Sequence, residues 1–408
     1  MIEDGGGADH DGRRPVRGVG PMRVLVSSTG GVGHLLPLLP LARALDRAGH
    51  GVRIACPESF AGFAGRYGLP VSGFGEPDPE ELAAVWATIP FDDTEQANRV
   101  VVGQVYGRLD ATAAVPGLDA LVGRWRPDLL LRDSAEFGAA LVAERYRLPC
   151  ARVGCSLAVM ESAFASAAAD GLAALRAAEG LPPDPEGSTL LAGAYLTQFP
   201  HSLEDPACAG DGAWRFRDAA PAREPLPEWW HGAEDPLVYV SFGTVAASQG
   251  LFPGLYAAAL DSLAELPVRV LVTVGEAGDP AALGPLPPGV HVERFVPQDR
   301  VLGAATVVVT HGGSGSVLGA LAAGLPLVVL PLFADQPHNA ARVAALGVGI
   351  TIAGGPAAAG QIGAAVAAVL DNPAYQVGAQ RIAAEIGALP TADQTAGMLA
   401  ELATPLPA

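Results

Sequence analysis

The chain of 408 residues contains no lysine: all 25 basic residues are arginines, against 43 acidic residues. Without lysine there can be no Schiff base to a protein amine and no phosphate-loop lysine. The formal charge of −18 argues against nucleic acid and anionic membrane surfaces as partners, because like charges repel. The length exceeds what one hydrophobic core usually organises, so two domains are expected.

Cysteine is scarce as well. Cys56, Cys150, Cys155 and Cys208 are too few and too scattered for a disulfide framework, and no His/Cys ligand cluster is evident in the sequence. No Asp-x-Asp pair lies at a predicted strand end in the catalytic region. We therefore expect reduced thiols, a cytoplasmic location, no metal ion and no other cofactor.

Signals for export or membrane insertion are weak. Residues 1–21 carry glycines and charges but no apolar segment, which predicts a disordered tail and not a signal peptide. The uncharged run from Val317 to Ala334 is long enough to span a bilayer. Pro326 and Pro331 favour instead a buried helix followed by a buried strand. We expect no stable membrane insertion, and a monomer or a homodimer.

From Met22 onward, short β-branched runs alternate with longer alanine- and leucine-rich segments, which is the pattern of repeated βα units. The alternation fails between Phe199 and Pro236, where Pro, Asp and Gly are frequent. The sequence therefore predicts an α/β fold of two Rossmann-like domains facing each other across a cleft. The predicted strands are RVLVSS, HGVRIAC, PDLLLRD and CARVGC before the linker, and LVYVSFGT, VRVLVTVG, VHVERFV, ATVVVTH and LPLVVLP after it. The expected parts are a tail (1–21), an N-terminal domain (22–204), a linker (205–235), a C-terminal domain (236–388) and a C-terminal helix that can return to the N-terminal domain (389–408).

A glycine turn, STGGVGHLLP, follows the first predicted strand. Gly31 and Gly33 supply two glycines of a GxGxxG dinucleotide motif, but Leu36 stands where the third is needed. His34 begins a helix at the carboxyl end of a strand, where α/β sheets bind ligands, although it could simply pack against that helix. Asp133 follows another strand and can hydrogen-bond to His34, or can cap the next helix.

Further polar clusters follow three later strands. In HGGSGS, 311–316, glycines let the backbone approach a ligand, the helix N-terminus attracts a phosphate, and His311 can add a donor. The SFGT stretch, 241–244, ends a strand in the same way, and Asp335 and Gln336 offer the acceptor and the amide that sugar hydroxyls require. Each cluster alone could be a tight turn or a helix cap. Together they indicate a pyrophosphate with a polyhydroxy group beyond it.

The stretches GHLLP, FVPQ (295–298), THGGSGSVLGAL and PLFADQPHNAARV resemble the nucleotide-sugar-dependent family 1 glycosyltransferases with the GT-B fold. The nearest members are the bacterial enzymes that decorate antibiotics and related natural products. The resemblance extends from about Met22 to the end. It implies an inverting, metal-independent hexosyltransferase in which His34 is the general base and Asp133 is its partner. Many relatives have tryptophan where Phe295 stands.

The resemblance and the polar clusters together assign the remaining site residues. The donor is expected at Ser241, Gly243, Thr244, Phe295, Val296, Gln298, His311, Gly313, Ser314, Gly315, Ser316, Asp335 and Gln336. Segments 75–125 and 155–200 are expected to line the acceptor pocket, with Trp86, Phe91, Tyr106, Met160 and Phe164 suited to an apolar aglycone, although such residues are more often plain core.

The prediction of the donor nucleotide rests on one sequence position. In ribonucleotide-using relatives a glutamate commonly stands eight residues after the phosphate histidine and accepts hydrogen bonds from the ribose, and here that position is Gly319. We therefore expect a dTDP-sugar, such as a deoxysugar, as co-substrate. The alternatives are a UDP-sugar-dependent transferase of small lipophilic acceptors, a non-catalytic helper protein of the same fold, and a nucleotide-sugar epimerase. The presence of both His34 and Asp133 argues against a helper.

Overall fold

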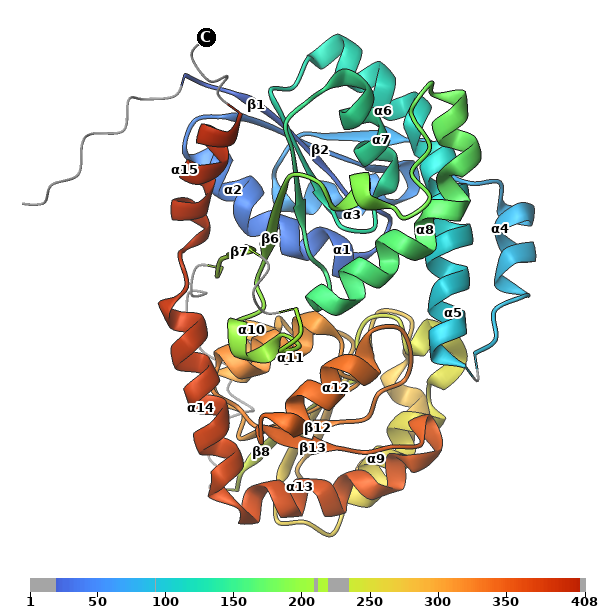
Figure 1. Cartoon of the computed structure of the whole chain (residues 1–408). Coiled ribbons are helices and arrows are strands. Elements are labelled where there is room, and N and C mark those ends of the chain that lie inside the picture. The colour runs from blue at the N-terminus through green and yellow to red at the C-terminus, as the bar shows by residue number, and fades with distance from the viewer. Residues whose placement is uncertain (1–19, 92, 209–211, 219–234, 404–408) are drawn as a thin grey trace, which may run out of the picture.

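The computed structural model describes residues 20–91, 93–208, 212–218 and 235–403, which form two parallel α/β domains (Figure 1). The first domain contains a seven-stranded sheet of order β3-β2-β1-β4-β5-β6-β7, and the second a six-stranded sheet of order β10-β9-β8-β11-β12-β13. Both orders reverse beside the domain's first strand, so each sheet has a switch point, at β1/β4 and at β8/β11. The predicted fold of two Rossmann-like domains is confirmed.

The elements of the first domain run in chain order to residue 215. Its strands are β1 (Arg23–Ser27), β2 (Gly51–Pro57), β3 (Val71–Phe74), β4 (Leu129–Asp133), β5 (Cys150–Val153), β6 (Ala194–Thr197) and β7 (Trp214–Arg215). Its α-helices are α1 (Val32–Leu35), α2 (Leu39–Arg47), α3 (Ala61–Ala64), α4 (Pro79–Trp86), α5 (Thr94–Val100), α6 (Ala111–Trp125), α7 (Phe137–Tyr146) and α8 (Ala158–Ala178). A π-helical segment, η4 (Val101–Asp110), joins α5 to α6.

The second domain follows from residue 237. Its strands are β8 (Leu237–Ser241), β9 (Arg269–Thr273), β10 (Val290–Glu293), β11 (Val307–Thr310), β12 (Leu327–Val329) and β13 (Gly349–Thr351). The helices are α9 (Gly254–Leu263), α10 (Gln298–Leu302), α11 (Ser314–Ala322), α12 (Gln336–Ala345), α13 (Ile362–Asp371), α14 (Pro373–Ala388) and α15 (Ala392–Leu402).

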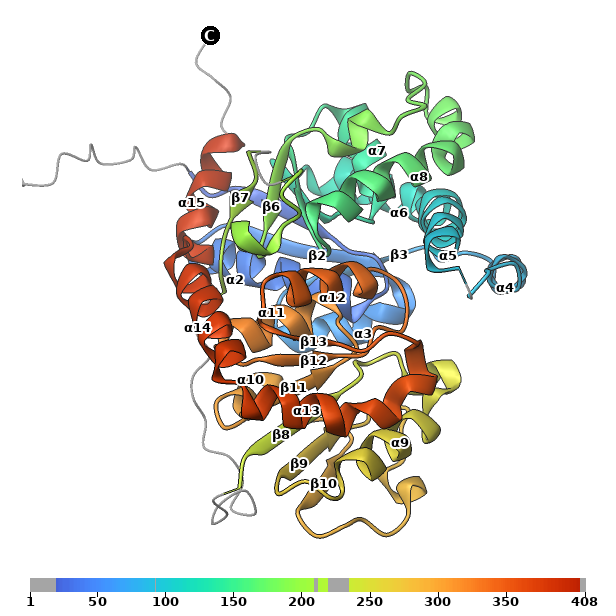
Figure 2. The same cartoon turned by 60° about the horizontal axis from the view of Figure 1, so that its bottom comes forward.

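The central strands are apolar on both faces because helices cover both faces of each sheet. In the first sheet, Val24 and Val26 pack on the face that meets α2 and α15, whereas Leu25 and Leu130 pack on the face that meets α6 and α7. Figure 2 shows α11 and α12 between the second sheet and the first domain. The core on that side of the second sheet also takes in Leu157 of the first domain.

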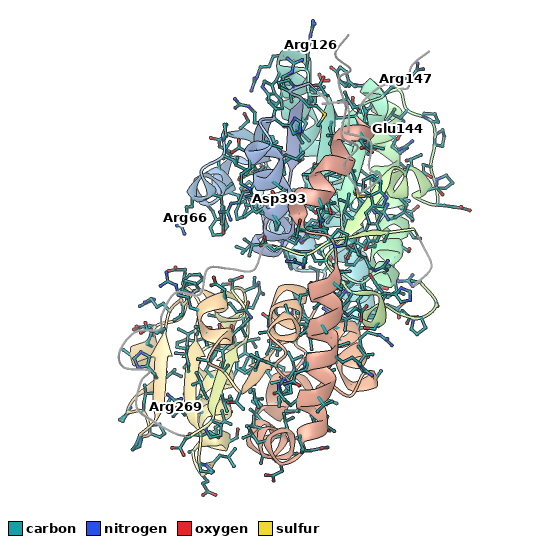
Figure 3. The ribbon with its side chains drawn as sticks, turned by 90° about the vertical axis from the view of Figure 1, so that its left-hand side faces the viewer. Arg66, Arg126, Glu144, Arg147, Arg269 and Asp393 are labelled. Carbon is teal, nitrogen blue, oxygen red and sulfur yellow. The ribbon has the colours of Figure 1, made fainter. Side chains whose placement is uncertain are left out.

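The chain crosses between the domains more than once. Trp214–Arg215 lies within the segment expected as a linker, and it pairs with β6 as the edge strand of the first sheet. Figure 3 shows α14 and α15 along one side of the molecule, with Asp393 at the start of α15. Helix α15 packs against the first domain through Leu399, and Arg47 of α2 forms an ion pair with Asp393 at 2.7 Å. Thr391 begins α15 with a capping box.

Two expectations concern membranes and the tail. Residues 1–19 of the expected tail lie outside the described residues. Among the described residues, only α8 is long and apolar enough to cross a membrane by length and composition, and 44% of its most apolar window is buried. A core helix passes the same test. Here Ala168 and Leu172 of α8 are core residues.

Candidate active site

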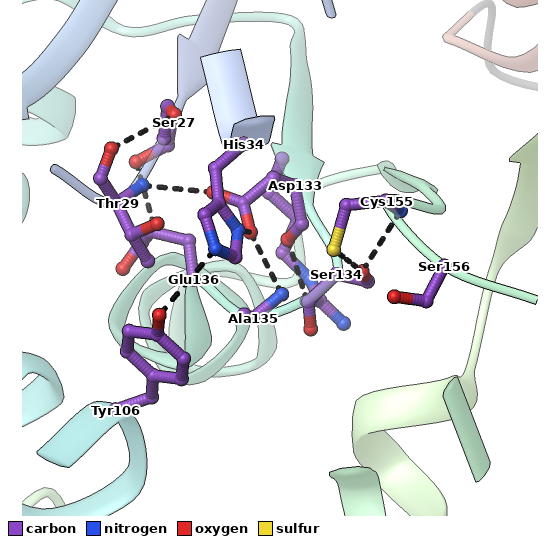
Figure 4. Close-up of polar contacts among 12 residues, drawn as sticks. Ser27, Thr29, His34, Tyr106, Asp133, Ser134, Ala135, Glu136, Cys155 and Ser156 are labelled. Carbon is purple, nitrogen blue, oxygen red and sulfur yellow. Dashed lines mark hydrogen bonds and ion pairs between the residues drawn. The ribbon is translucent and has the colours of Figure 1, made fainter. Parts of the chain in front are cut away.

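The switch point of the first sheet brings His34 and Asp133 together (Figure 4). β1 and β4 are neighbours, so their carboxyl ends lie side by side; α1 carries His34 just beyond β1, and Asp133 is the last residue of β4. The Nδ1 atom of His34 lies 3.1 Å from Oδ1 of Asp133. The predicted proximity of these two side chains is therefore present in the structure.

The Asp133 carboxylate is 1% exposed and is held by three groups. Besides His34, the backbone N–H groups of Thr29 and Ala135 each donate to it at 2.8 Å. These three groups satisfy the hydrogen-bonding capacity of the carboxylate in its buried position. The alternative role as a helix cap belongs to the next carboxylate instead, because Glu136 accepts from the Ala139 amide at the start of α7.

His34 is only 19% exposed at its side chain. Burial lowers the pKa of the ring, but the Asp133 carboxylate raises it, and the pKa of His34 lies well above the ordinary 6.5. Its Nε2 atom lies 3.5 Å from the hydroxyl of Tyr106, whose ring meets the imidazole edge to face. Nδ1 is thus engaged by the carboxylate, while Nε2 faces a hydroxyl.

The π-helical segment η4 supplies two groups to this site. Tyr106 was expected in the acceptor pocket, and it lies directly beside His34. Asp110, four residues later, is one that the sequence analysis missed: burial raises its pKa to about 6, an effect that His34 opposes and the Asp133 carboxylate reinforces. Burial also raises the pKa of the Tyr106 hydroxyl. From the sequence this segment was assigned only to the acceptor pocket, with no geometry, so Asp110 could not be placed.

Cys155 is a further missed neighbour of His34. Its Sγ atom lies 3.2 Å from Oγ of Ser134, and burial raises the pKa of the thiol while His34 lowers it. The donor atoms of His34, Asp133 and Cys155 lie within 4.8 Å of one another, a grouping that could hold a metal ion. The sequence-based statement that no His/Cys ligand cluster exists is therefore wrong, because strands distant in sequence bring these residues together.

The switch point of the second sheet carries the expected phosphate segment. The last residues of β8 and β11, Ser241 and Thr310, are paired in register, so His311 and Gly243 lie just beyond adjacent strand ends. A Cβ atom at Gly243 or at Gly313 would come within 2.7 Å of the His311 ring, so these two positions require glycine. The imidazole thus fills the space between two glycine turns.

His311 carries no positive charge at neutral pH. Burial lowers its pKa to about 4, although Asp335 and a hydrogen bond with the Ser241 backbone oppose that shift. Thr310 Oγ1 lies 3.2 Å from Nδ1, and which of the two atoms donates depends on the ring tautomer. Positive potential at this edge of the sheet comes instead from the N-terminus of α11, which begins at Ser314.

The remaining donor residues differ in exposure. Gly315 and Thr244 are exposed, Ser316 is half-buried with its amide bonded to the Gly313 carbonyl, and the Ser314 hydroxyl donates to Oδ2 of Asp335 at 2.7 Å. Gln336 is buried, and its Oε1 accepts from the amides of Leu332 and Phe333, so only its NH₂ group remains for a ligand.

The FVPQ segment lies beside α11. Phe295 is 63% exposed, Val296 packs against the second domain's core, and Gln298 begins α10. Within the described chain, the Nε2 atom of Gln298 is buried without a hydrogen-bond partner. A Cβ atom at Gly319 would lie 3.6 Å from Oε1 of Gln298, so Gly319 faces that side chain.

A cavity of about 900 Å³ separates α5, η4 and α8 from the start of α12. Met160 and Phe164 line it, as expected for an acceptor pocket, and Pro337 and His338 close it from the second domain. Trp86 and Phe91 do not line this cavity: they are exposed and stack on each other, with ring centroids 6.4 Å apart. The five expected acceptor residues therefore fall into three separate places.

Two more buried polar groups were missed. Asn339, four residues after Asp335, donates to Oδ2 of that carboxylate at 3.0 Å and to the Gly312 carbonyl at 2.9 Å. Its position one helical turn from Asp335 could have indicated this contact. The position of Ser156 could also have been predicted from the sequence, because this residue follows the predicted strand CARVGC and so lies at the same sheet edge as Asp133.

Comparison with known proteins gives a consistent result. Residues 257–402 match the family described as erythromycin biosynthesis protein CIII-like, C-terminal domain. The chain is 31% identical over 399 residues to an L-demethylnoviosyl transferase of Streptomyces niveus, covering 95% of this chain and 100% of the relative. It also resembles the glycosyltransferase SsfS6 of Streptomyces sp. SF2575 complexed with thymidine diphosphate, with TM-score 0.75, 28% identity, and coverage of 93% and 99%. The glycosyltransferase SnogD from Streptomyces nogalater matches with TM-score 0.75, 26% identity, and coverage of 94% and 100%.

Proposed function

Because the chain belongs to the natural-product glycosyltransferases of the GT-B fold, we propose that it transfers a sugar from a dTDP-sugar to a hydroxyl of an apolar aglycone, with inversion. The observation that carries the proposal is the pair of His34 and Asp133, 3.1 Å apart at the switch point of the first sheet. A base held by a buried carboxylate is the arrangement that proton removal from an alcohol requires. The nucleotide in this proposal is dTDP because Gly319 offers no acceptor to a ribose hydroxyl, and the transferred sugar is proposed to be a deoxysugar.

The reaction assigned to these residues is a single displacement. Nε2 of His34 takes the proton of the acceptor hydroxyl, while Asp133 holds the ring through Nδ1 and stabilises the imidazolium that forms. The acceptor oxygen bonds to the anomeric carbon as the bond from that carbon to the phosphate oxygen breaks. The electron pair leaves with the nucleoside diphosphate, whose charge the N-terminal amides of α11 stabilise.

The donor and acceptor have separate places in this proposal. The pyrophosphate lies against 312–316, the sugar lies near Asp335, and the nucleoside lies between Phe295 and the buried Nε2 of Gln298. The aglycone lies in the cavity lined by Met160 and Phe164, with its reacting hydroxyl where Tyr106 now faces His34. A volume near 900 Å³ suits a polycyclic or macrocyclic compound.

The test is a screen of aglycones against dTDP- and UDP-sugars, with mass spectrometry of the products and release of nucleoside diphosphate measured in parallel. Release that depends on an added aglycone identifies a transferase. Nucleoside diphosphate release that does not need an aglycone would contradict the transferase. No release with any pair of aglycone and sugar nucleotide would contradict it as well, and both results would favour the helper protein or the epimerase.

The matched variant is His34→Ala. Because general-base catalysis contributes about a hundredfold or more to a rate, this variant should still bind dTDP but lose most transfer. Wild-type turnover in His34→Ala would show that His34 is not the base and only packs against its helix.

A further inference from the structure

Two consecutive residues of the first domain contact both halves of the site. Cys155 lies beside His34, as described above. Ser156 is buried, at 3% exposure, and its hydroxyl donates to Oδ2 of Asp335 at 3.0 Å. The acceptor-side base and the carboxylate expected to hold the sugar are therefore connected through a single peptide unit.

The Asp335 carboxylate uses its two oxygens differently. Oδ2 accepts from three donors, namely the hydroxyls of Ser156 and Ser314 and the amide of Asn339, at 3.0, 2.7 and 3.0 Å. Of these donors only Ser156 belongs to the first domain. Oδ1 accepts no hydrogen bond from the part of the chain that the structure describes. That oxygen is therefore available to accept from the hydroxyls of a sugar.

Ser156 is itself fixed in place by a buried carboxylate. Oε1 of Glu161 accepts from the Ser156 amide at 3.1 Å, from the Cys155 amide at 3.1 Å and from the Ser134 hydroxyl at 2.9 Å. Ser134 directly follows Asp133 in the chain. The same carboxylate therefore holds the backbone of Ser156 and the loop that carries the partner of the base.

We propose that Ser156 is a positioning residue for the transfer: its hydroxyl holds Asp335 so that Oδ1 meets the donor sugar, and it fixes the sugar's distance from His34. This inference rests on the proposed function. Reaction rates depend steeply on such placement, so a shift of about 1 Å can cost on the order of a hundredfold in rate. In the proposed function the nucleotide lies against 312–316, Phe295 and Gln298 and not against Ser156, so the affinity for the nucleotide should stay unaffected.

The experiment compares Ser156→Ala with Ser162→Ala, a control on the exposed face of α8 whose hydroxyl bonds only within its own helix, to the Ala158 carbonyl. Calorimetry measures the affinity for dTDP and for dTDP-glucose, and steady-state kinetics follow with any acceptor found. For Ser156→Ala we expect unchanged dTDP affinity, donor affinity reduced to that of dTDP, and kcat reduced about tenfold to a hundredfold. Ser156→Thr, which keeps the hydroxyl, should recover part of the loss.

Two outcomes overturn the proposal. One is equal loss of dTDP and dTDP-glucose affinity, which would make Ser156 a residue of general structure; the other is unchanged donor affinity and kcat. A double-mutant cycle of Ser156→Ala with Asp335→Ala, measured by urea unfolding, tests the bond without any substrate, and absence of coupling also contradicts the proposal. If the wild type glycosylates no acceptor, the proposed function fails. The double-mutant cycle and the calorimetry still test whether Ser156 holds Asp335 and affects donor affinity.

Discussion

His34 must be neutral to act as a base, and the Asp133 carboxylate at 3.1 Å opposes that state by raising the pKa of the ring well above 6.5. Below that pKa the ring holds its proton, so kcat/KM should increase as the pH rises through it. Asp133→Asn removes the charge that raises the pKa. Its rising limb should therefore lie at lower pH, with a plateau about a hundredfold or more below the parent's.

The measurement for this pair is a pH profile of kcat/KM for both proteins in constant ionic strength. Glu144→Gln, which changes a half-buried carboxylate far from the site in an ion pair with Arg176, provides a control for loss of one negative charge. Overlapping profiles for Asp133→Asn and the parent would show that this carboxylate does not control the base.

The grouping of His34, Asp133 and Cys155 raises the question of a metal ion. Two of these groups already bind each other, and the pyrophosphate is expected at the amides of α11, which take the place of a cation. We therefore expect transfer activity to survive exhaustive EDTA treatment. An activity assay before and after chelation checks this, and loss that Mg²⁺ or Mn²⁺ restores would refute it.

Gly319 lies against Gln298 and offers no acceptor to a ribose hydroxyl. Gly319→Glu should therefore strengthen UDP binding relative to dTDP, by about tenfold or more, because a hydrogen bond to a charged group contributes about 1.5–3 kcal/mol. The neighbouring contact, 3.3 Å from the built Cβ to Leu302 Cδ1, involves the end of a flexible side chain. Competition by the two nucleotides measures the shift, with Gly319→Gln as the uncharged control. Parent protein that binds UDP as well as dTDP would show that the ribose is recognised elsewhere.

At the scale of elements, the contact of η4 with α8 places Tyr106 and Asp110 beside His34. Gly171 of α8 touches the backbone of η4 so closely that a Cβ there would overlap the carbonyl oxygen of Gly103. Gly171→Ala should destabilise the fold by about 1–3 kcal/mol and also reduce activity, because η4 must move away. Gly397→Ala, on the exposed face of α15 with nothing within 4 Å of the added Cβ, should instead stabilise by about 0.4–1 kcal/mol. Urea unfolding measures the change in stability of both variants, and a turnover assay measures their activity. Equal changes in the free energy of unfolding would contradict the close contact between Gly171 and η4.

The strands named from the sequence, which include β1, β4, β8 and β11 at the two switch points, are present in the structure, because apolar β-branched runs and the glycine turns after them are local signals. The short strands β3, β6, β7 and β13 were not named. That is why His34, just beyond one predicted strand, and Asp133, at the end of another, could be placed at the same sheet edge, whereas the resemblance was needed to choose their pairing over a helix cap. Tyr106 and Asp110 could not be placed relative to His34, since the π-helical geometry of η4 depends on contacts with α8 far away in sequence. Gln336 shows a different limit, because the backbone groups that bind its Oε1 come from a turn whose geometry the pattern does not reveal.

At the scale of the whole molecule, the two domains are joined at several points besides the site. Leu157 lies in a core of the second domain, Asn98 of α5 donates to the Ala334 carbonyl at 3.1 Å, and α15 returns to pack on α2. Arg217 adds backbone bonds to the segment between α14 and α15. These contacts keep the carboxyl ends of the two sheets facing each other, so substrates held by different domains meet between them.

That arrangement determines the stereochemistry we expect. The base belongs to the first domain and the phosphate segment to the second, and the proposed single displacement uses them to place the acceptor oxygen and the leaving phosphate on opposite sides of the anomeric carbon. No carboxylate is assigned the role of a covalent nucleophile, and a single displacement inverts the carbon. The glycoside should therefore have the anomeric configuration opposite to that of the donor. The coupling constant of the anomeric proton in the NMR spectrum of the product measures this directly. Retained configuration would contradict the single displacement proposed for His34.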